Sequence, residues 1–283
     1  MLSKVVEYFI DHKVRQRIAI ALAKGSASRA ARRVDLQHPA TWEFSGFSQN
    51  GEDGVIDVLR SQLKCTNRYI VEIGAAEGTE NNSSWLLTTA GYEGLMIEGD
   101  SRQSARARRN IGRYSIGSQF VPMFVTLETV DMILCKTAFY DPDVFSLDID
   151  GNDWHIANAL FAREFRPKIV VVEYNSAFGP DRSLASKYCD DFRRSTADPS
   201  QLYYGVSLVG WKTFFEKRGY SFICIDSNGV NAFFVDAQQL DDAFLASLQP
   251  RQGFIENRYQ LRAYGRDHAG QFALIANKPF EQV

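Results

Sequence analysis

Short apolar runs that alternate with helix-length segments constrain the fold of this chain more than any other feature. From about residue 68, each run ends in a polar or glycine-containing turn, which is the pattern of repeated β-α units and predicts a parallel sheet. The predicted strands are 69–73, 94–97, 119–123, 144–149 and 169–174. Two later runs, 221–225 and 232–235, flank an Asn-Gly turn and predict an antiparallel hairpin that closes the sheet. The sequence therefore predicts a Rossmann-like α/β fold, mostly parallel, with a C-terminal antiparallel hairpin.

Length and composition limit the classes of protein that this chain can belong to. With 283 residues, of which 45% are hydrophobic, it can form one large domain with an appendage. Its net charge of -2 argues against a nucleic-acid partner bound through overall positive charge. The four cysteines form no CxxC pair, so neither a zinc site nor a disulfide framework is predicted, and a reducing cytoplasm fits best. We expect no signal peptide and no transmembrane span.

The first 40 residues differ from the rest and are predicted to form a basic amphipathic helical extension, with the catalytic domain at 41–283. Residues 1–34 contain eight basic residues against two acidic ones. An apolar residue recurs every four positions, which predicts one stripe of a helix: Val6, Ile10, Val14, Ile18 and Leu22. The stripe can pack on the domain or on a second copy of the chain, or it can lie on an anionic membrane surface. Residues 25–28 are a predicted break in this helix.

Polar residues follow several predicted strands, and ligands of open α/β sheets bind at that edge. Gly74 and Gly78 come after the first strand and permit a tight turn with close approach of a ligand to the backbone. Glu98 ends the next strand, where a carboxylate can accept both hydroxyls of a ribose. The alternative for Glu98 is a solvated loop carboxylate.

A cluster of aspartates follows the fourth predicted strand. Asp148, Asp150 and Asp153 lie within six residues, and carboxylates so close together repel unless a cation, a proton or a ligand amine offsets them. Glu173 and Asn175 follow the next strand, so oxygen ligands from both strand ends could hold Mg²⁺. A turn followed by a helix N-cap is the alternative, because Asp and Asn satisfy free backbone N–H groups.

Together these motifs resemble the class I S-adenosylmethionine-dependent methyltransferases, and more closely the FkbM-like and nodulation-factor-type sugar O-methyltransferases. The resemblance covers residues 45–236. It rests on these segments: SQNGEDG (48–54), VEIGAAEG (71–78) followed by Asn81-Asn82, IEGD (97–100), LDIDGND (147–153), VVEYNSAFGP (171–180) and NAFFV (231–235). It implies transfer of a methyl group from S-adenosylmethionine to a hydroxyl of a sugar, a glycan or a related small molecule.

The resemblance also implies roles for individual residues. The implied cofactor-binding residues are Gln49, Glu72, Gly74, Ala75, Gly78, Asn82, Glu98, Gly99, Asp100 and Asp148. The implied metal ligands are Asp148, Glu173 and Asn175; metal-dependent relatives usually carry an aspartate after the fifth strand, so the Glu-x-Asn spacing favours a metal-free site.

The transfer also needs a base for the acceptor hydroxyl and a pocket for the acceptor. The candidate bases are Asp148, Asp150 and His155, although His155 could equally pack within the fold. The candidate acceptor-binding residues are Asp153, Asn175, Tyr203 and Tyr204; the two tyrosines could equally be core residues.

Two other classes of protein remain open at this point. Asp148-x-Asp150 after an apolar strand also resembles the nucleophile motif of haloacid-dehalogenase-like phosphatases, although that motif normally lies on the first strand. A non-catalytic nucleotide-binding or scaffolding protein would keep the fold and use the basic helix to bind its partner.

Overall fold

A seven-stranded sheet forms the centre of the structure, a computed structural model that describes residues 2–248 and 253–283, with side chains from residue 12 onward. The strand order is β3-β2-β1-β4-β5-β8-β7, and only β8 runs antiparallel to its neighbours. The strands are β1 Tyr69–Ile73, β2 Glu93–Glu98, β3 Gln119–Pro122, β4 Val144–Leu147, β5 Ile169–Glu173, β7 Tyr220–Ile225 and β8 Asn231–Asp236. The predicted α/β fold, with its parallel strands and its C-terminal antiparallel hairpin, is confirmed.

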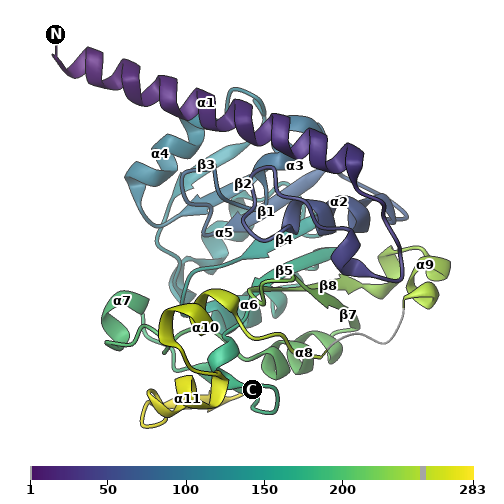
Figure 1. Ribbon diagram of the computed structural model, residues 1–283, viewed down its shortest axis with the longest axis vertical. Coiled ribbons are helices and arrows are strands. Elements are labelled where there is room, and N and C mark those ends of the chain that lie inside the picture. The colour runs from purple at the N-terminus through teal and green to yellow at the C-terminus, as the bar shows by residue number, and fades with distance from the viewer. Residues whose placement is uncertain (1, 249–252) are drawn as a thin grey trace.

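Helices cover both faces of this sheet (Figure 1). The α-helices are α1 Leu2–Ala31, α2 Glu52–Ser61, α3 Ser84–Thr89, α4 Ser101–Asn110, α5 Val130–Lys136, α6 Asp153–Phe161, α7 Arg194–Ala197, α8 Leu208–Glu216, α9 Asp242–Ser247, α10 Arg258–Tyr264 and α11 His268–Ala273. Short 3-10 helices lie at η1 Pro39–Thr41, η2 Leu127–Thr129, η3 Ser176–Phe178 and η4 Ala237–Gln239. A second sheet pairs β6 Leu184–Ser186 with β9 Phe280–Gln282; strands of three residues are too short for the sequence pattern to predict.

Alternate residues of each central strand enter different hydrophobic cores, as the period of two requires. In β1, Val71 and Ile73 pack in one core and Ile70 packs in the other. The first core also contains residues of α5, α6 and α8, and the second contains residues of α2, α3 and α9. Because packed helices cover both faces, a ligand can reach the sheet only at the strand ends.

The second half of α1 packs on the domain. Ile18 is 4% exposed in the second core, where Val14 and Leu22 are partly buried. Arg29 and Arg32 form ion pairs of 2.8 and 2.6 Å with the buried Asp57 of α2. The apolar stripe therefore packs on the domain from residue 14 onward, whereas packing on a second copy of the chain stays a prediction; Val6 and Ile10 lie outside the residues whose side chains are described.

The predicted break at residues 25–28 is wrong, because α1 continues to Ala31. A Cβ on Gly25 would lie 2.6 Å from the Trp85 ring and 2.8 Å from the Gly46 Cα atom. This glycine therefore permits close helix packing and does not interrupt the helix. The proposed division of the chain at residue 40 stays a prediction.

Among the described residues, no helix is both long enough and apolar enough to span a membrane.

We predict that Ile18→Ala lowers the free energy of unfolding by about 2–4 kcal/mol, because it leaves a cavity under α1. Ile20→Ala is the matched control: Ile20 lies on the same helix and is 64% exposed, so its replacement should change stability by less than about 0.5 kcal/mol. Urea denaturation of both variants measures the difference. Equal effects would contradict the docking of α1 on the core.

Candidate functional site

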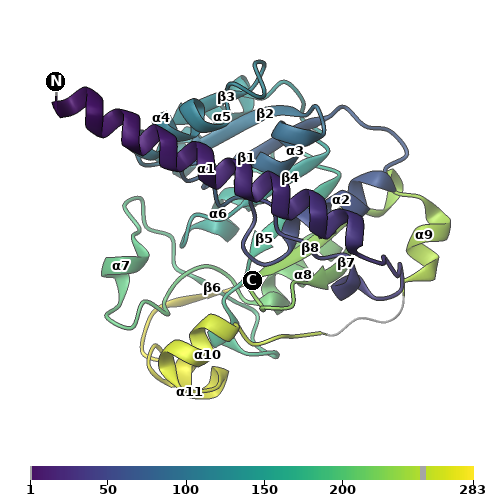
Figure 2. The ribbon, with the colours of Figure 1, turned by 45° about the horizontal axis from the view of Figure 1, so that its top comes forward.

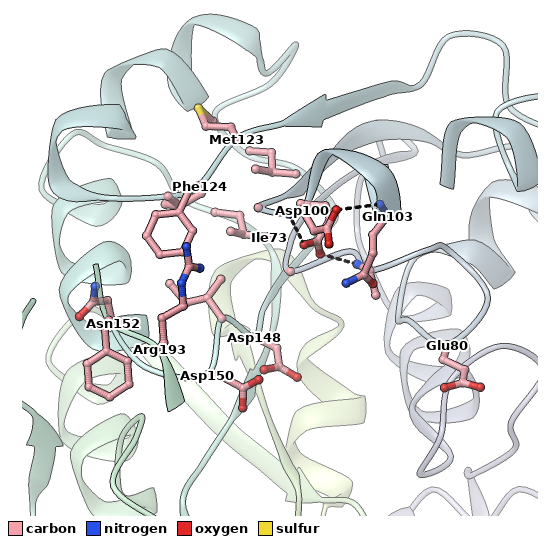
Figure 3. A pocket seen from close by; sticks show the side chains of 18 residues that line it. Ile73, Glu80, Asp100, Gln103, Met123, Phe124, Asp148, Asp150, Asn152 and Arg193 are labelled. Carbon is pink, nitrogen blue, oxygen red and sulfur yellow. Dashed lines mark hydrogen bonds between the residues drawn. The ribbon is translucent and has the colours of Figure 1, made fainter. Parts of the chain in front are cut away.

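A cavity of about 470 Å³ opens at the carboxyl ends of β1, β2 and β4 (Figure 3). On one side the guanidinium of Arg193 lies 4.1 Å from the ring centroid of Phe124, and on the other side lie Asp100 and Gln103. Its floor is apolar and its rim is polar. Its remaining lining residues are Ile73, Gly74, Ala76, Glu80, Ile97, Glu98, Gly99, Met123, Val125, Asp148, Ile149, Asp150, Asn152 and Phe192. The volume suits a nucleoside-sized ligand.

The glycine turn after β1 is fitted closely against β4. Gly74 has φ +91°, and a Cβ there would lie 1.7 Å from the carbonyl oxygen of Asp148. The Glu98 carboxylate then fixes the turn to β2, accepting hydrogen bonds from the backbone N–H of Ala76 at 2.9 Å and of Asp100 at 2.8 Å. A carboxylate held by two backbone groups has a defined position and keeps acceptor capacity for a ligand in the cavity.

A smaller cavity of about 100 Å³ continues from the first behind this turn. Glu72 lines it and is buried, accepting from the Asn82 backbone N–H at 2.8 Å and from the Asn81 side chain at 2.9 Å. Burial raises the pKa of Glu72 to about 7, even though these donors favour the charged form. Gln49 closes the opposite wall and donates to Glu80 at 3.1 Å. The cavity is thus lined by groups that can bind a small zwitterion.

An acidic cluster lies where these cavities meet. One oxygen from each of Asp148, Asp150 and Glu173 lies within 4.8 Å of the others. The side chain of Asp148 is exposed to the cavities; desolvation by the protein around it, and then repulsion by Asp150 and Asp153, raise its pKa to about 8. Burial and repulsion by Asp148 also raise the pKa of Glu173 well above its usual value. The Asp148–Glu173 pair therefore holds a proton more readily than an isolated carboxylate does.

Arg194 supplies positive charge inside this cluster. Its Nη1 donates to Asp150 at 2.6 Å, and its guanidinium lies 3.7 Å from the ring centroid of Tyr204. Burial alone would lower the pKa of Arg194, but the charges of Tyr204, Glu173 and Asp150 outweigh burial and raise it. The cluster is therefore partly neutralised by a side chain of the protein itself.

A third cavity, of about 390 Å³, lies on the other side of the acidic cluster and has α10 as one wall. Its lining includes Tyr259, Gln260 and Tyr264 of α10, with Asn257 at the start of that helix. Two neighbouring residues of α10 form hydrogen bonds with different parts of the site. Tyr259 donates to Asn50 at 3.1 Å, and Gln260 donates at 2.9 Å to the Tyr204 hydroxyl.

The Tyr204 hydroxyl completes a chain of hydrogen bonds from α10 to the acidic cluster, since it donates to Glu173 at 3.2 Å. Asp148 lines all three cavities. A ligand in the first two cavities and a second molecule in the third would therefore meet beside Asp148.

Most of the implied cofactor-binding residues reach the first two cavities. Those that line one or both are Gln49, Glu72, Gly74, Asn82, Glu98, Gly99, Asp100 and Asp148. Ala75 is 1% exposed and lies within the turn. At Gly78, φ is +75° and an added Cβ would lie 2.9 Å from Ile111, so this glycine serves the packing of the turn near α4.

Two candidate residues of the aspartate segment lie away from the cavities. Asp153 is 2% exposed and accepts from the backbone N–H of Ile149 and Gly151, so it holds the turn that aims Asp150. His155 is buried in α6, and its Nε2 lies 2.9 Å from the Ser186 carbonyl oxygen. For these two residues the geometry matches the structural alternatives, a helix start and a packed histidine.

Asn175 and Tyr203 are likewise occupied within the protein. The Asn175 amide donates to the carbonyl oxygens of Leu202 and Tyr204 and accepts from Ala177, so it is not available to a metal or an acceptor. The Tyr203 hydroxyl donates to the Pro279 carbonyl oxygen and accepts from Lys187. Asp150 lies in the position that was expected of Asn175, close to Asp148 and Glu173.

Several residues of the site were not found by sequence reasoning. Arg193 precedes the short helix α7 and Arg194 begins it, and Tyr259, Gln260 and Tyr264 lie far along the chain from the strand-end motifs. No periodicity marks them, because a loop or short helix is brought to the sheet by tertiary packing alone. The C-terminal segment is the feature that could have indicated them, because its apolar residues predict that it packs on the domain.

Comparisons with known proteins give limited information. No protein-family model matches the sequence, and neither does any curated protein. Among solved structures, an O-methyltransferase from Bacillus cereus in complex with SAH is 16% identical, with 77% of this chain and 89% of that chain covered and a TM-score of 0.42. The O-methyltransferase TomG from Streptomyces achromogenes in complex with SAM is also 16% identical, with 75% and 93% covered and a TM-score of 0.42. A methyltransferase from Geobacter sulfurreducens is 13% identical, with 79% and 88% covered and a TM-score of 0.43. At these identities and scores, the function has to be argued from the site itself.

We predict that Gly74→Ala destabilises the protein by more than about 3 kcal/mol, because the added Cβ collides with the backbone of β4. Gly205→Ala is the matched control: Gly205 also has a positive φ, +62°, but nothing lies within 4 Å of an added Cβ. That variant should lose only about 1 kcal/mol, the cost of the backbone conformation. Thermal and urea unfolding compare the two. Equal losses would mean that the close approach of Gly74 to Asp148 is not required.

Proposed function

We propose that this chain is an S-adenosylmethionine-dependent O-methyltransferase. The observation that carries the proposal is the meeting of three cavities at Asp148, with a nucleoside-sized cavity on one side and an acidic pair facing a third cavity on the other. Such an arrangement brings two different molecules to one point, which is the main requirement of a transfer reaction.

The cofactor proposal is supported by the fit of the residues to each part of S-adenosylmethionine. Glu98 would accept the ribose hydroxyls, and the apolar wall of Ile97 and Phe124 would lie against the adenine. Glu72 and Gln49 would bind the methionine part in the smaller cavity. Gly74 lines both cavities and permits the close contact between the turn and the Asp148 backbone that brings them together. When bound, this cofactor supplies a methyl group on a positively charged sulfur.

The catalytic proposal assigns the acceptor proton to the Asp148–Glu173 pair. A hydroxyl is a poor nucleophile, and a carboxylate whose pKa is raised towards neutrality is a better base than an ordinary one. Arg194 and Tyr204 hold the pair in place through Asp150 and Glu173. In this proposal Asp148 keeps the role of base predicted from the sequence, Glu173 takes the place of His155, and Asp150 positions the pair through Arg194.

A sugar, a glycan or a related polyhydroxylated molecule is the proposed acceptor. The third cavity combines carboxylates and amides, which accept and donate hydrogen bonds to hydroxyls, with the side chains of Tyr259 and Tyr264. Flat aromatic faces bind the apolar faces of sugar rings. Methyl transfer from radiolabelled S-adenosylmethionine to a panel of methyl glycosides, nucleotide sugars and phenols tests this choice, and exclusive transfer to phenols would reject it.

The phosphatase alternative has less support. The three carboxylates of the acidic cluster would repel a phosphate ester. A scaffold without activity would bind S-adenosylmethionine and transfer nothing.

We predict that Glu98→Ala weakens binding of S-adenosylmethionine by about 1–3 kcal/mol, or about 5–150-fold, because the ribose hydroxyls lose a buried partner. Glu93→Ala is the matched control, since Glu93 is exposed and begins the same strand. Isothermal titration measures both affinities. If the folded Glu98→Ala variant binds as tightly as the parent protein, Glu98 has no role in binding the ribose.

We predict that kcat rises with pH through the neutral range and levels off above about 8, because the base acts deprotonated and burial raises the pKa of Asp148. Asp148→Asn should remove this rise and lower kcat by roughly 10²–10⁴-fold, with cofactor affinity little changed. Initial rates across pH, with cofactor binding measured in parallel, test this.

The same assay separates the metal-free mechanism from a magnesium mechanism. Asp148, Asp150 and Glu173 could supply oxygen ligands, but Arg194 already provides positive charge there. EDTA should therefore leave the rate unchanged. Loss of activity in EDTA and its recovery with Mg²⁺ would replace the proposed base by a metal-activated hydroxyl.

A further inference from the structure

Charge is unevenly distributed along this chain. Residues 1–34 contain eight basic and two acidic residues, and residues 100–113 contain five arginines and one aspartate. These two segments carry net charges of +6 and +4, while the whole chain carries -2, so the remainder carries -12. A near-neutral protein of this kind can still have one strongly positive face if the two basic segments lie together.

The fold places these two segments side by side. Figures 1 and 2 both show α4 next to the N-terminal half of α1. Glu77 connects them, since Arg17 of α1 and Arg106 of α4 approach its carboxylate at 3.2 and 3.5 Å. In the ion pairs described for Arg17 and Arg106, the only acidic partners are Glu77 and Glu80. The excess positive charge therefore remains at the surface.

Several of these basic side chains are directed to solvent. Lys13 and Arg15 of α1 and Arg102 of α4 are exposed, and none forms a side-chain hydrogen bond or ion pair with another residue whose side chain is described. Basic side chains near an anionic lipid surface are each attracted to it by about 1 kcal/mol.

Apolar residues of α1 accompany the positive charge and favour a lipid bilayer over a nucleic acid as the partner. Ile20 on α1 is 64% exposed. The α1 backbone projects beyond the body of the protein at its N-terminal end (Figure 2), and the sequence there, LSKVVEYFI at 2–10, is mostly apolar. A nucleic acid offers phosphates but little that favours apolar residues, whereas a bilayer with anionic headgroups offers both kinds of contact.

We propose that α1 and α4 form a docking surface for an anionic lipid bilayer. The surface consists of Lys13, Arg15 and Arg17 of α1 and Arg102 and Arg106 of α4, together with the projecting end of α1. This proposal does not depend on methyl transfer. The surface lies beside the nucleoside-sized cavity, because Arg17 also binds Glu80, which lines that cavity.

Sedimentation of the full chain with large unilamellar vesicles tests this surface. Vesicles of phosphatidylcholine containing about one quarter phosphatidylglycerol should bind the protein at about 0.1 M salt, and binding should weaken at about 0.5 M salt as charges are screened. Vesicles of phosphatidylcholine alone should bind much less. The double variant Lys13→Gln/Arg15→Gln should bind about 25-fold more weakly and Arg102→Gln about fivefold more weakly, since each charge near the surface contributes about a factor of five.

The matched control removes the same charge from another part of the surface. Arg262→Gln/Arg266→Gln alters exposed arginines at α10 and after it, which both ribbon views show far from α1, and should bind like the parent protein. Circular dichroism verifies that every variant is folded. Equal binding to neutral vesicles, equal weakening by the control, or tighter binding to a short DNA duplex than to the anionic vesicles would each overturn the proposal. A change of oligomeric state in the α1 and α4 variants, without any loss of vesicle binding, would also overturn it.

Discussion

The contact between the Gly74 turn and the end of β4 determines the rest of the site. The Asp148 backbone N–H donates to the Ile73 carbonyl oxygen at 3.0 Å. The backbone at Gly74 lies so close to the Asp148 carbonyl that no side chain would fit between them. This single approach brings the glycine turn, the carboxylate of Glu98 and the acidic cluster to one edge of the sheet. Parallel strands make it possible, because their carboxyl ends point the same way and each can contribute one polar group.

The acidic cluster has an electrostatic cost that its neighbours reduce. Asp148, Asp150 and Glu173 lie close together, and desolvation with mutual repulsion raises the pKa values of Asp148 and Glu173. Arg194 offsets part of that repulsion, and Tyr204 gives Glu173 a hydrogen bond. Gln260 fixes the Tyr204 hydroxyl in turn, so a helix near the C-terminus takes part in holding the central carboxylates.

The sequence predicts the sheet well and the site in part, for reasons that differ between residues. Hydrophobic runs report the strands because burial on both faces requires them, and strand ends such as Glu98 and Asp148 follow directly. Local pattern does not tell a carboxylate that faces a cavity from one that caps a turn, so Asp150 and Asp153 looked alike although only Asp150 faces the cavities. Arg194 and Gln260 could not be found at all, since nothing in the local sequence distinguishes them from other polar residues of the chain.

Arg193 and Arg194 are consecutive residues that reach different cavities. Arg193 lies against Phe124 at the edge of the nucleoside-sized cavity, and Arg194 binds Asp150 beside the third cavity. A planar peptide bond joins them, so a rotation of the backbone at one residue moves the other. A molecule beside Phe124 that displaced Arg193 would therefore also move Arg194 and its contact with Asp150. Through that contact, occupancy of the first cavity would change the wall of the third.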